Sequence, residues 1–402
     1  MARRCGSAVW VMVSLALLAA GCGAKPAVGV LLPTTGAAGT YGESIESGVR
    51  LAITECREKN LLPKGLEIVW ADSGSDPARA VAELEKLVHD RGVRLVIGGA
   101  TSAEAKAILP ELERLGVVCL SPSASAPGLG KQSDLFFRIY PSDELEGHTA
   151  AAFLYERLGQ KQVILYEGNK EYVPGIEPAF RKQYEEALHG SVVAVISLDE
   201  AGWRERSAAA LSSTGVAAVY IVGYAEETLE VLRHLKQQGF AGRVVATSAF
   251  YSTRVIRDAG PLAEDLLFPL PPFDRTSEKE PVLSFVNRYM DAYNRAPDVF
   301  AAHGYDAMRF AIEVMRLGPA QLTEIKQAFQ FGVRDFMGVT GPIVFDDFGE
   351  VKHYPKMFLV KGGQVLNYER WLDSEKERIY HEVQNLLFQK KPHVESTPTP
   401  TP

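Results

Sequence analysis

The chain has 402 residues, of which 46% are hydrophobic and 23% charged, as is typical of globular proteins. This length exceeds what one compact core holds, so we expect two lobes. The net charge of −7 provides no basic surface, and we expect no nucleic-acid partner. Beyond the N-terminus, no run reaches the roughly 18 to 20 uncharged apolar residues that span a bilayer. We therefore expect a mature protein that is soluble apart from any anchor.

The N-terminal segment predicts export. Two arginines precede the apolar stretch Ala8–Ala20, and small residues then precede Cys22. This pattern resembles a bacterial lipobox, although Ala19 stands where leucine is commoner. We expect residues 1–21 to be removed as a lipoprotein signal peptide, and Cys22 to carry a lipid anchor in the periplasm or at the cell surface. The alternative is an ordinary signal cleaved near Ala24, without lipid.

The two cysteines inside the mature chain are Cys56 and Cys119. An exported protein lies in a compartment that permits disulfides, but the sequence does not place these two residues within bonding distance. We expect two separately buried thiols and leave a disulfide as the alternative. The chain has no metal-binding spacing of the CxxC or HExxH kind, so we expect no metal site.

From Ala27 onward, short apolar runs alternate with amphipathic helical segments. The runs that we expect to form strands are 28–32, 66–70, 95–97, 117–120, 163–166, 192–196, 217–222 and 244–246. Because these runs are uniformly apolar and helical segments follow them, the pattern predicts an α/β fold. Its sheets should be parallel and covered by helices on both faces.

The run FPLPPF, at 268–273, interrupts this alternation. Three prolines in four residues argue against a helix or a central strand, so we expect an extended connection. The remaining expected elements are helices at 282–293, 300–317 and 322–331, and strands at 342–345, 356–360 and 364–368. An amphipathic helix and a disordered or extended Thr/Pro tail should occupy 369–402.

Loops that follow strands are the candidate site, because ligands bind at the carboxyl ends of parallel strands. The loop 33–42 is rich in glycine but lacks a phosphate-binding motif, and Tyr41 is its one large side chain. The later candidates are Ser102, Ser123, Ser125, Asp143, Tyr172 and Tyr224. Each has an ordinary alternative role in helix capping, loop turns or packing. Together they are typical of a pocket with apolar walls and a few polar groups.

Several segments resemble the type I periplasmic binding proteins, in particular the branched-chain amino-acid (Leu/Ile/Val) binding family. They include VGVLLPTTGAAGTYGESIESGVRLAI, VIGGATSAEAKAI, GVVCLSPSASAPGL, FFRIYPSDELEGHTAAAFL and PDVFAAHGYDAMRFAIEVM. They follow the family's order and spacing over residues 27–368. The resemblance implies a two-lobed fold in which each lobe is a mostly parallel sheet flanked by helices.

The resemblance also implies lobe boundaries. Three hinge crossings are expected near 140–143, 268–273 and 341–345. Lobe 1 would then comprise 27–142 and 272–343, lobe 2 would comprise 143–271 and 344–368, and the C-terminal extension would follow.

Residue by residue, the resemblance implies ligand contacts in the first lobe. Ser102 matches a serine that binds the ligand carboxylate, and Ser123 matches a backbone contact. Ser125 matches a threonine that binds carboxylate and amine, and Tyr41 matches an aromatic beside the ligand side chain. Asp143 matches an aspartate near the ligand ammonium.

In the second lobe, Tyr172 and Tyr224 match aromatic residues, and Ser248 departs from the pattern. Amino-acid binders usually place a glutamate for the ammonium where this chain has Ser248. A buried ammonium without a carboxylate is costly, so either Asp143 serves alone or the ligand lacks that charge. Phe250 and Tyr251 are expected to form an apolar or stacking wall beside Ser248.

We therefore expect a binding protein that captures a small molecule by cleft closure and delivers it to an ABC permease. An amino acid is the leading ligand, with amides, ureas and aromatic acids as alternatives. We expect a monomer without cofactor and not an enzyme, since no G-x-S-x-G elbow and no histidine lies in the candidate loops. The alternative is a sensory or accessory lipoprotein without a transport role, which the extension 369–402 keeps open.

Overall fold

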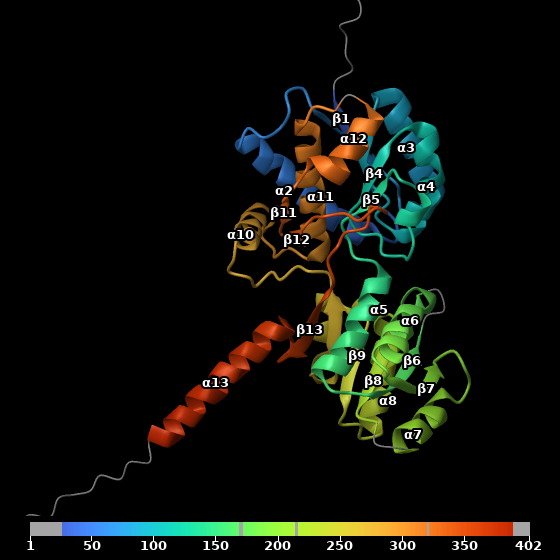
Figure 1. The fold of residues 1–402 in the computed structure, drawn as a ribbon, viewed down its shortest axis with the longest axis vertical. Coiled ribbons are helices and arrows are strands. Elements are labelled where there is room, and N and C mark those ends of the chain that lie inside the picture. The colour runs from blue at the N-terminus through green and yellow to red at the C-terminus, as the bar shows by residue number, and fades with distance from the viewer. Residues whose placement is uncertain (1–25, 169–171, 214–215, 320, 389–402) are drawn as a thin grey trace, which may run out of the picture. The chain divides into compact units, whose positions relative to one another are not determined.

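The computed structural model describes residues 26–168, 172–213, 216–319 and 321–388 (Figure 1). The predicted signal peptide and Cys22 lie outside the described residues. Cys56 and Cys119 are both buried and free, which confirms the expectation of two separate thiols. Among the described helices, none is both long and apolar enough to cross a membrane.

The described chain divides into two compact units. Unit 1 comprises the residues up to Asp143 together with Pro271–His353, and unit 2 comprises Glu144–Leu270 and the residues from Tyr354 onward. The sequence placed the last crossing between 343 and 344, but the division lies after His353. The difference arises because the intervening segment belongs to unit 1, where Glu350 forms a bridge with Arg138 and Val351 forms one with Phe345.

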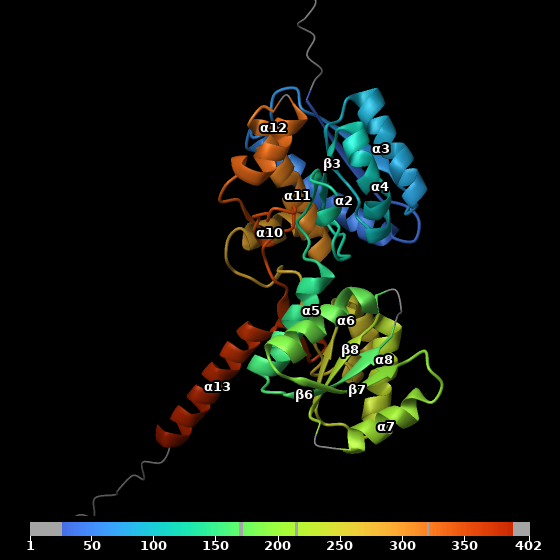
Figure 2. The same cartoon turned by 45° about the vertical axis from the view of Figure 1, so that its right-hand side comes forward.

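Unit 1 is built on a five-stranded parallel sheet of order β2-β1-β3-β4-β5. Its strands are β1 (Ala27–Leu32), β2 (Glu67–Asp72), β3 (Leu95–Ile97), β4 (Val118–Ser121) and β5 (Phe136–Arg138). Its α-helices are α2 (Gly39–Glu58), α3 (Pro77–Arg91), α4 (Ser102–Leu115), α10 (Val282–Tyr293), α11 (Val299–Arg316) and α12 (Leu322–Gln327). The short elements are η2 (Gly130–Gln132), η7 (Ala328–Gly332), β11 (Met337–Gly338) and β12 (Gly341–Pro342). Figures 1 and 2 show α3 and α4 side by side along the sheet.

Unit 2 is built on a seven-stranded sheet of order β14-β13-β10-β9-β8-β6-β7, in which only β13 and β14 pair antiparallel. Its strands are β6 (Gln162–Glu167), β7 (Ser191–Ser197), β8 (Ala218–Val222), β9 (Arg243–Ala246), β10 (Leu267–Leu270), β13 (Lys356–Lys361) and β14 (Gln364–Asn367). Its α-helices are α5 (Asp143–Ala152), α6 (Val173–Arg181), α7 (Trp203–Ser213), α8 (Ala225–Gln237), α9 (Thr253–Ala259) and α13 (Tyr368–Phe388). The short elements are η3 (Phe153–Arg157), η4 (Lys182–Ala187), η5 (Ser248–Phe250) and η6 (Gly260–Leu262).

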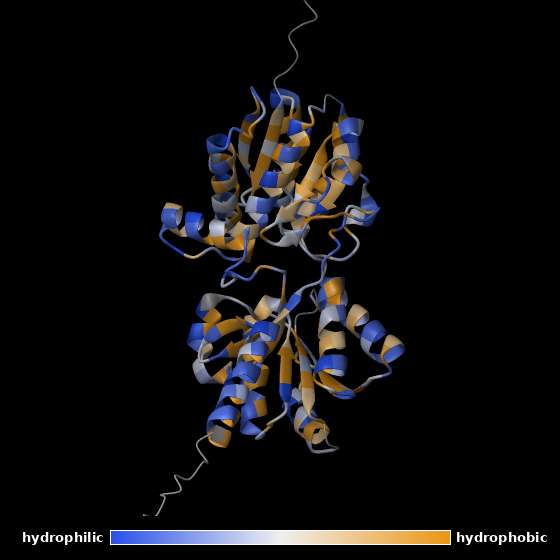
Figure 3. Ribbon diagram, turned by 60° about the vertical axis from the view of Figure 1, so that its left-hand side comes forward, coloured by the Kyte–Doolittle hydropathy of each residue, from blue (hydrophilic) through white to orange (hydrophobic). Residues whose placement is uncertain are grey.

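Both faces of the unit 2 sheet are buried, which confirms the predicted helix cover. Along β8, Val219 and Ile221 belong to one apolar cluster, whereas Ala218, Tyr220 and Val222 belong to another. Successive strand residues point to opposite faces, so each cluster lies on its own side of the sheet. Figure 3 shows the same distribution, with apolar residues along the strands and polar residues on the outer helix surfaces.

The FPLPPF segment is not wholly the connection that the sequence predicted. Its first half lies in β10, which is buried between β9 and β13. Pro269 pairs with Met357 of β13, whereas β9 pairs with β10 only at Leu267. The proline is tolerated because the strand on its other side has already ended, so its missing N–H removes no bond there.

In unit 1, α2 and α11 pack backbone against backbone at two glycines. A Cβ on Gly48 would lie 1.9 Å from the carbonyl oxygen of Ala301, and one on Gly304 would lie 2.3 Å from that of Ile45. Both helices are mostly buried over their length. The absence of a side chain at these two positions therefore sets the distance between the helices, and with it the position of the first turn of α2.

Replacing Gly48 by alanine tests this close contact. In an exposed helix, Gly→Ala stabilises by about 0.5–1 kcal/mol. Here the added methyl group forces the helices apart, so we expect a loss of about 1–3 kcal/mol in the free energy of unfolding of unit 1. Urea denaturation measures this change, and a variant as stable as the wild type or more so would show that the helices separate without cost.

Candidate functional site

The candidate residues follow strand ends within each unit. In unit 1 the loops after β1, β3 and β4 leave the same edge of the sheet, because these strands are parallel neighbours. In unit 2 the loops after β6, β8 and β9 do the same. The predicted site residues therefore form two groups, one at the carboxyl edge of each sheet.

The loop after β1 is held by Asp72 at the end of β2. Its carboxylate accepts hydrogen bonds from the backbone N–H groups of Thr34 and Thr35, at 3.0 and 3.2 Å, and from the Thr35 hydroxyl at 2.7 Å. Burial alone would raise the pKa of Asp72, but the hydrogen bonds from Thr35 and the Gly74 backbone outweigh it and lower the pKa to about 2. The loop is thus clamped to the sheet by an ionised carboxylate at neutral pH.

Tyr41 lies in the first turn of α2, not in the loop where the sequence placed it. Its ring is 53% exposed and meets the ring of Phe300 edge-on, at 4.9 Å between centroids. The ring of Tyr140 is parallel to that of Phe300 at 6.2 Å. Tyr41 therefore belongs to an aromatic group whose other two members the sequence did not single out.

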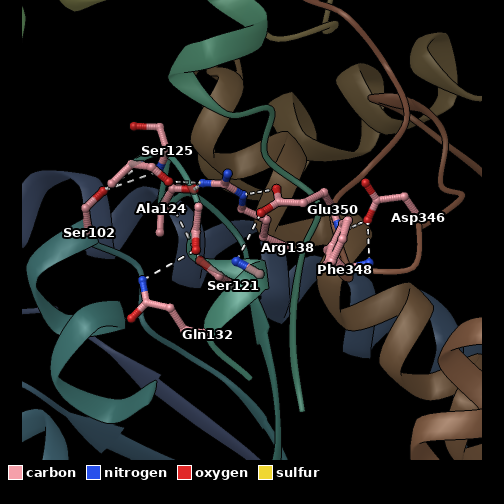
Figure 4. Close-up of polar contacts among 12 residues, drawn as sticks. Ser102, Ser121, Ala124, Ser125, Gln132, Arg138, Asp346, Phe348 and Glu350 are labelled. Atoms are coloured by element: carbon pink, nitrogen blue, oxygen red, sulfur yellow. Dashed lines mark hydrogen bonds and ion pairs between the residues drawn. The ribbon is translucent and has the colours of Figure 1, made fainter. Parts of the chain in front are cut away.

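Ser102 is the first residue of α4 but not its cap. Thr101 forms a capping box with Glu104, so the ordinary capping role is already filled. The Ser102 oxygen accepts hydrogen bonds from the backbone N–H groups of Ser125 and Ala126, at 3.3 and 3.1 Å (Figure 4). A hydroxyl has two acceptor positions and one donor, so these contacts engage its acceptors and leave the O–H to donate.

The serine loop, residues 121–126 after β4, closes on the loop after β3. Ser121 and Ser123 donate their hydroxyls to the carbonyl oxygens of Gly99 and Ala100, at 2.8 and 2.6 Å. Figure 4 shows the Ser125 hydroxyl directed away from these contacts. The structure thus brings Ser102, Ser123 and Ser125 together, with Ser123 engaged internally.

A buried arginine supports the serine loop from below, and sequence analysis missed it. Arg138 is fully buried at the end of β5 and donates to the carbonyl oxygens of Ala124 and Ala126, at 3.1 and 2.8 Å. It also forms an ion pair with Glu350, which accepts the Gly130 N–H at 3.1 Å (Figure 4). The available signal was a single charge inside the apolar run FFRIY, because a buried charge requires a partner.

Asp143 is buried and begins α5. Its backbone N–H donates to the Ser125 carbonyl oxygen at 2.9 Å. The serine loop is therefore bonded on both sides, to Ser102 and to the residue that begins α5.

In unit 2, Tyr172 and Tyr224 lie against each other. Tyr172 immediately precedes α6 and Tyr224 immediately precedes α8, after the neighbouring strands β6 and β8. Their rings stack at 5.1 Å between centroids with an interplanar angle of 22°. Tyr224 is 45% exposed, so the pair offers an aromatic surface at the carboxyl edge of the sheet.

Ser248 follows β9 and contacts a carboxylate that sequence analysis also missed. Its backbone N–H and its hydroxyl donate to the two carboxylate oxygens of Glu146, each at 2.6 Å. The expected aromatic wall beside Ser248 is wrong for Phe250, which is fully buried in the unit 2 core. Tyr251 stacks on Phe268 at 5.7 Å.

Replacing Arg138 by methionine tests its support of the serine loop. The variant leaves the Ala124 and Ala126 carbonyls without their donor and Glu350 without its cation, so we expect unit 1 to lose about 3–5 kcal/mol of stability. Urea unfolding measures the loss. Arg114→Met removes an exposed pair with Glu85 and serves as the control, with little change expected. Equal stability of the two variants would contradict the supporting role.

Comparison with known proteins supports one family across most of the chain. The family model described as "Periplasmic binding protein" matches residues 26–363. A leucine-, isoleucine-, valine-, threonine-, and alanine-binding protein of Pseudomonas aeruginosa is 29% identical over 328 residues, 80% of this chain and 86% of that protein. The Leu/Ile/Val-binding protein of Escherichia coli is 25% identical over 338 residues, 81% of this chain and 88% of that protein. The structure of LivJ, a branched-chain amino acid transporter substrate-binding protein from Streptococcus pneumoniae, in complex with isoleucine, is 26% identical with a TM-score of 0.70, covering 85% of this chain and 97% of that one. The chain therefore belongs to the periplasmic binding protein family and has its two-lobed type I fold.

Proposed function

We propose that this chain is a solute-binding protein that captures a free amino acid and delivers it to an ABC importer. Its family places it outside the cytoplasm. Relatives that match most of the chain are named for binding leucine, isoleucine and valine. The observation that carries the proposal is the Ser102 hydroxyl, held by two backbone N–H groups at the start of α4.

The Ser102 end of the site suits a carboxylate. The first N–H groups of a helix have no partner within the helix, and the helix dipole places partial positive charge there. The Ser102 hydroxyl adds a donor beside them, and its position is set by the Arg138-supported serine loop. A carboxylate ligand would therefore gain charge-assisted hydrogen bonds without reorganisation of the loop.

We propose that unit 2 completes the site through the stacked pair Tyr172 and Tyr224. Contacts that a ligand makes with unit 2 only in a closed form shift the population toward that form. A micromolar dissociation constant requires about 8 kcal/mol of net binding free energy. Several hydrogen bonds to charged groups and the desolvation of aromatic rings are of this magnitude.

Export and anchoring complete the proposal. Processing before Cys22 and its lipidation would hold the protein at the membrane beside a permease. The segment that carries this reading lies outside the described residues, so it rests on the sequence pattern alone.

We further propose that the chain only binds its solute and does not transform it. One serine–histidine contact in unit 2 has the elements of a nucleophile and a base: the Ser207 hydroxyl lies 2.9 Å from His234 and 2.6 Å from the Tyr166 hydroxyl. All three residues are buried under Trp203 and the surrounding core. Burial also lowers the pKa of His234. A solute at the strand edge has no access to this group, so its role is structural.

A ligand panel tests the proposed function. We expect leucine, isoleucine or valine to raise the melting temperature of the purified protein, and calorimetry to give a one-to-one complex. Ser102→Ala should weaken binding by about 10-fold or more, because it removes a hydrogen bond to a charged group. Ser212→Ala, an exposed hydroxyl on α7, is the control and should leave affinity unchanged. Stabilisation only by ligands without a carboxylate, or intact affinity in Ser102→Ala, would contradict this reading of the site.

A further inference from the structure

The carboxylate that is absent at position 248 is supplied from another element. Glu146 comes from α5, and each of its carboxylate oxygens accepts one hydrogen bond from Ser248, at 2.6 Å. The Glu146 side chain is therefore at the carboxyl edge of β9, where the polypeptide turns into η5. The residue is only 6% exposed, so this negative charge is largely removed from bulk water.

A close helix contact determines where Glu146 lies. The next residue, Gly147, packs against α6, and a Cβ there would lie 2.7 Å from the Ile176 carbonyl oxygen and 2.9 Å from the Phe180 nitrogen. Any side chain at this position would push α5 away from α6. Gly147 thus seats the first turns of α5 on α6, which itself begins just after Tyr172. The carboxylate and the tyrosine pair are accordingly held by neighbouring elements of the same unit.

The two donors of Ser248 act on the glutamate. Its hydroxyl has one proton, and that proton is donated to Glu146. Its backbone N–H holds the other oxygen, so the carboxylate plane is oriented by two contacts from one residue. The first turn of a helix also stabilises an anion through the helix dipole. Ser248 is therefore a positioning residue, and Glu146 is the group with charge to offer.

We propose that Glu146 selects a ligand that carries a cationic amino group, with Ser248 holding the glutamate in place. This inference rests on the proposed binding function and specifies its ligand class: a zwitterionic amino acid, in preference to an aromatic acid, an amide or a urea. A buried carboxylate favours a cation strongly, because the attraction between them increases as water is excluded. The same charge disfavours a ligand whose only ionic group is an anion.

The test compares two ligands that differ only in the amino group. Leucine and 4-methylpentanoate share a carbon skeleton and a carboxylate, but only leucine has an ammonium. We expect Glu146→Gln to raise the dissociation constant of leucine by about 10-fold or more while that of 4-methylpentanoate stays the same or falls. Glu144→Gln, an exposed residue on the same helix, is the matched control and should change neither value. Isothermal calorimetry on the purified protein provides both constants.

The serine variants separate positioning from direct contact. Ser248→Ala should reduce the preference for leucine over 4-methylpentanoate in the same direction as Glu146→Gln but to a smaller extent, and Ser248→Thr should retain it. Because the readout is a ratio of two affinities for one variant, a partial loss of folded protein does not alter it. If Glu146→Gln does not fold, Ser248→Ala still tests the proposal through this ratio.

Each remaining outcome is decisive. An unchanged ratio in both Glu146→Gln and Ser248→Ala, with leucine still bound, overturns the assignment of Glu146 and leaves the proposed function standing. A wild-type protein that binds 4-methylpentanoate as tightly as leucine overturns the preference for an amino group. A wild-type protein that binds none of the amino acids contradicts the proposed function itself.

Discussion

The parallel arrangement of the strands is the constraint on which the candidate site depends. Parallel neighbours end at one edge of a sheet, so loops that are far apart in sequence meet there without any need for long excursions. In unit 1 this edge brings the start of α4 to the serine loop, and in unit 2 it brings Tyr172 to Tyr224 and Glu146 to Ser248. The apolar strands provide rigidity, and the polar chemistry is confined to their ends.

Buried polar contacts convert this arrangement into a precise geometry. Arg138 loses its hydration on burial, and its stability depends on Glu350 and two carbonyl oxygens. The same contacts hold the serine loop to the sheet from the inside. In unit 2, the Ser248 donors hold Glu146 in a comparable way. Both supports are internal to one unit, so each half of the site is organised before any ligand arrives.

The sequence predicted most of the fold because each strand is an apolar run followed by an amphipathic helix. It did not predict β5, whose three residues are too few to show a period, and it misjudged β10, where Pro269 is tolerated beside the end of β9. The serine and tyrosine positions followed from the loops after strands and from the family resemblance. The supports did not, because Arg138 and Glu350 are 212 positions apart and Ser248 and Glu146 are 102 apart. No local pattern reports such a pairing, and Phe250 shows that an aromatic beside a site loop can instead belong to the core.

The central claim is that one amino acid binds to the strand-edge residues of both units. A crystal structure of the protein grown with leucine tests it most directly. The account predicts a ligand whose carboxylate contacts the Ser102 hydroxyl and the start of α4, and whose ammonium contacts Glu146. A ligand bound elsewhere, or one that contacts only one of the two units, would contradict the account.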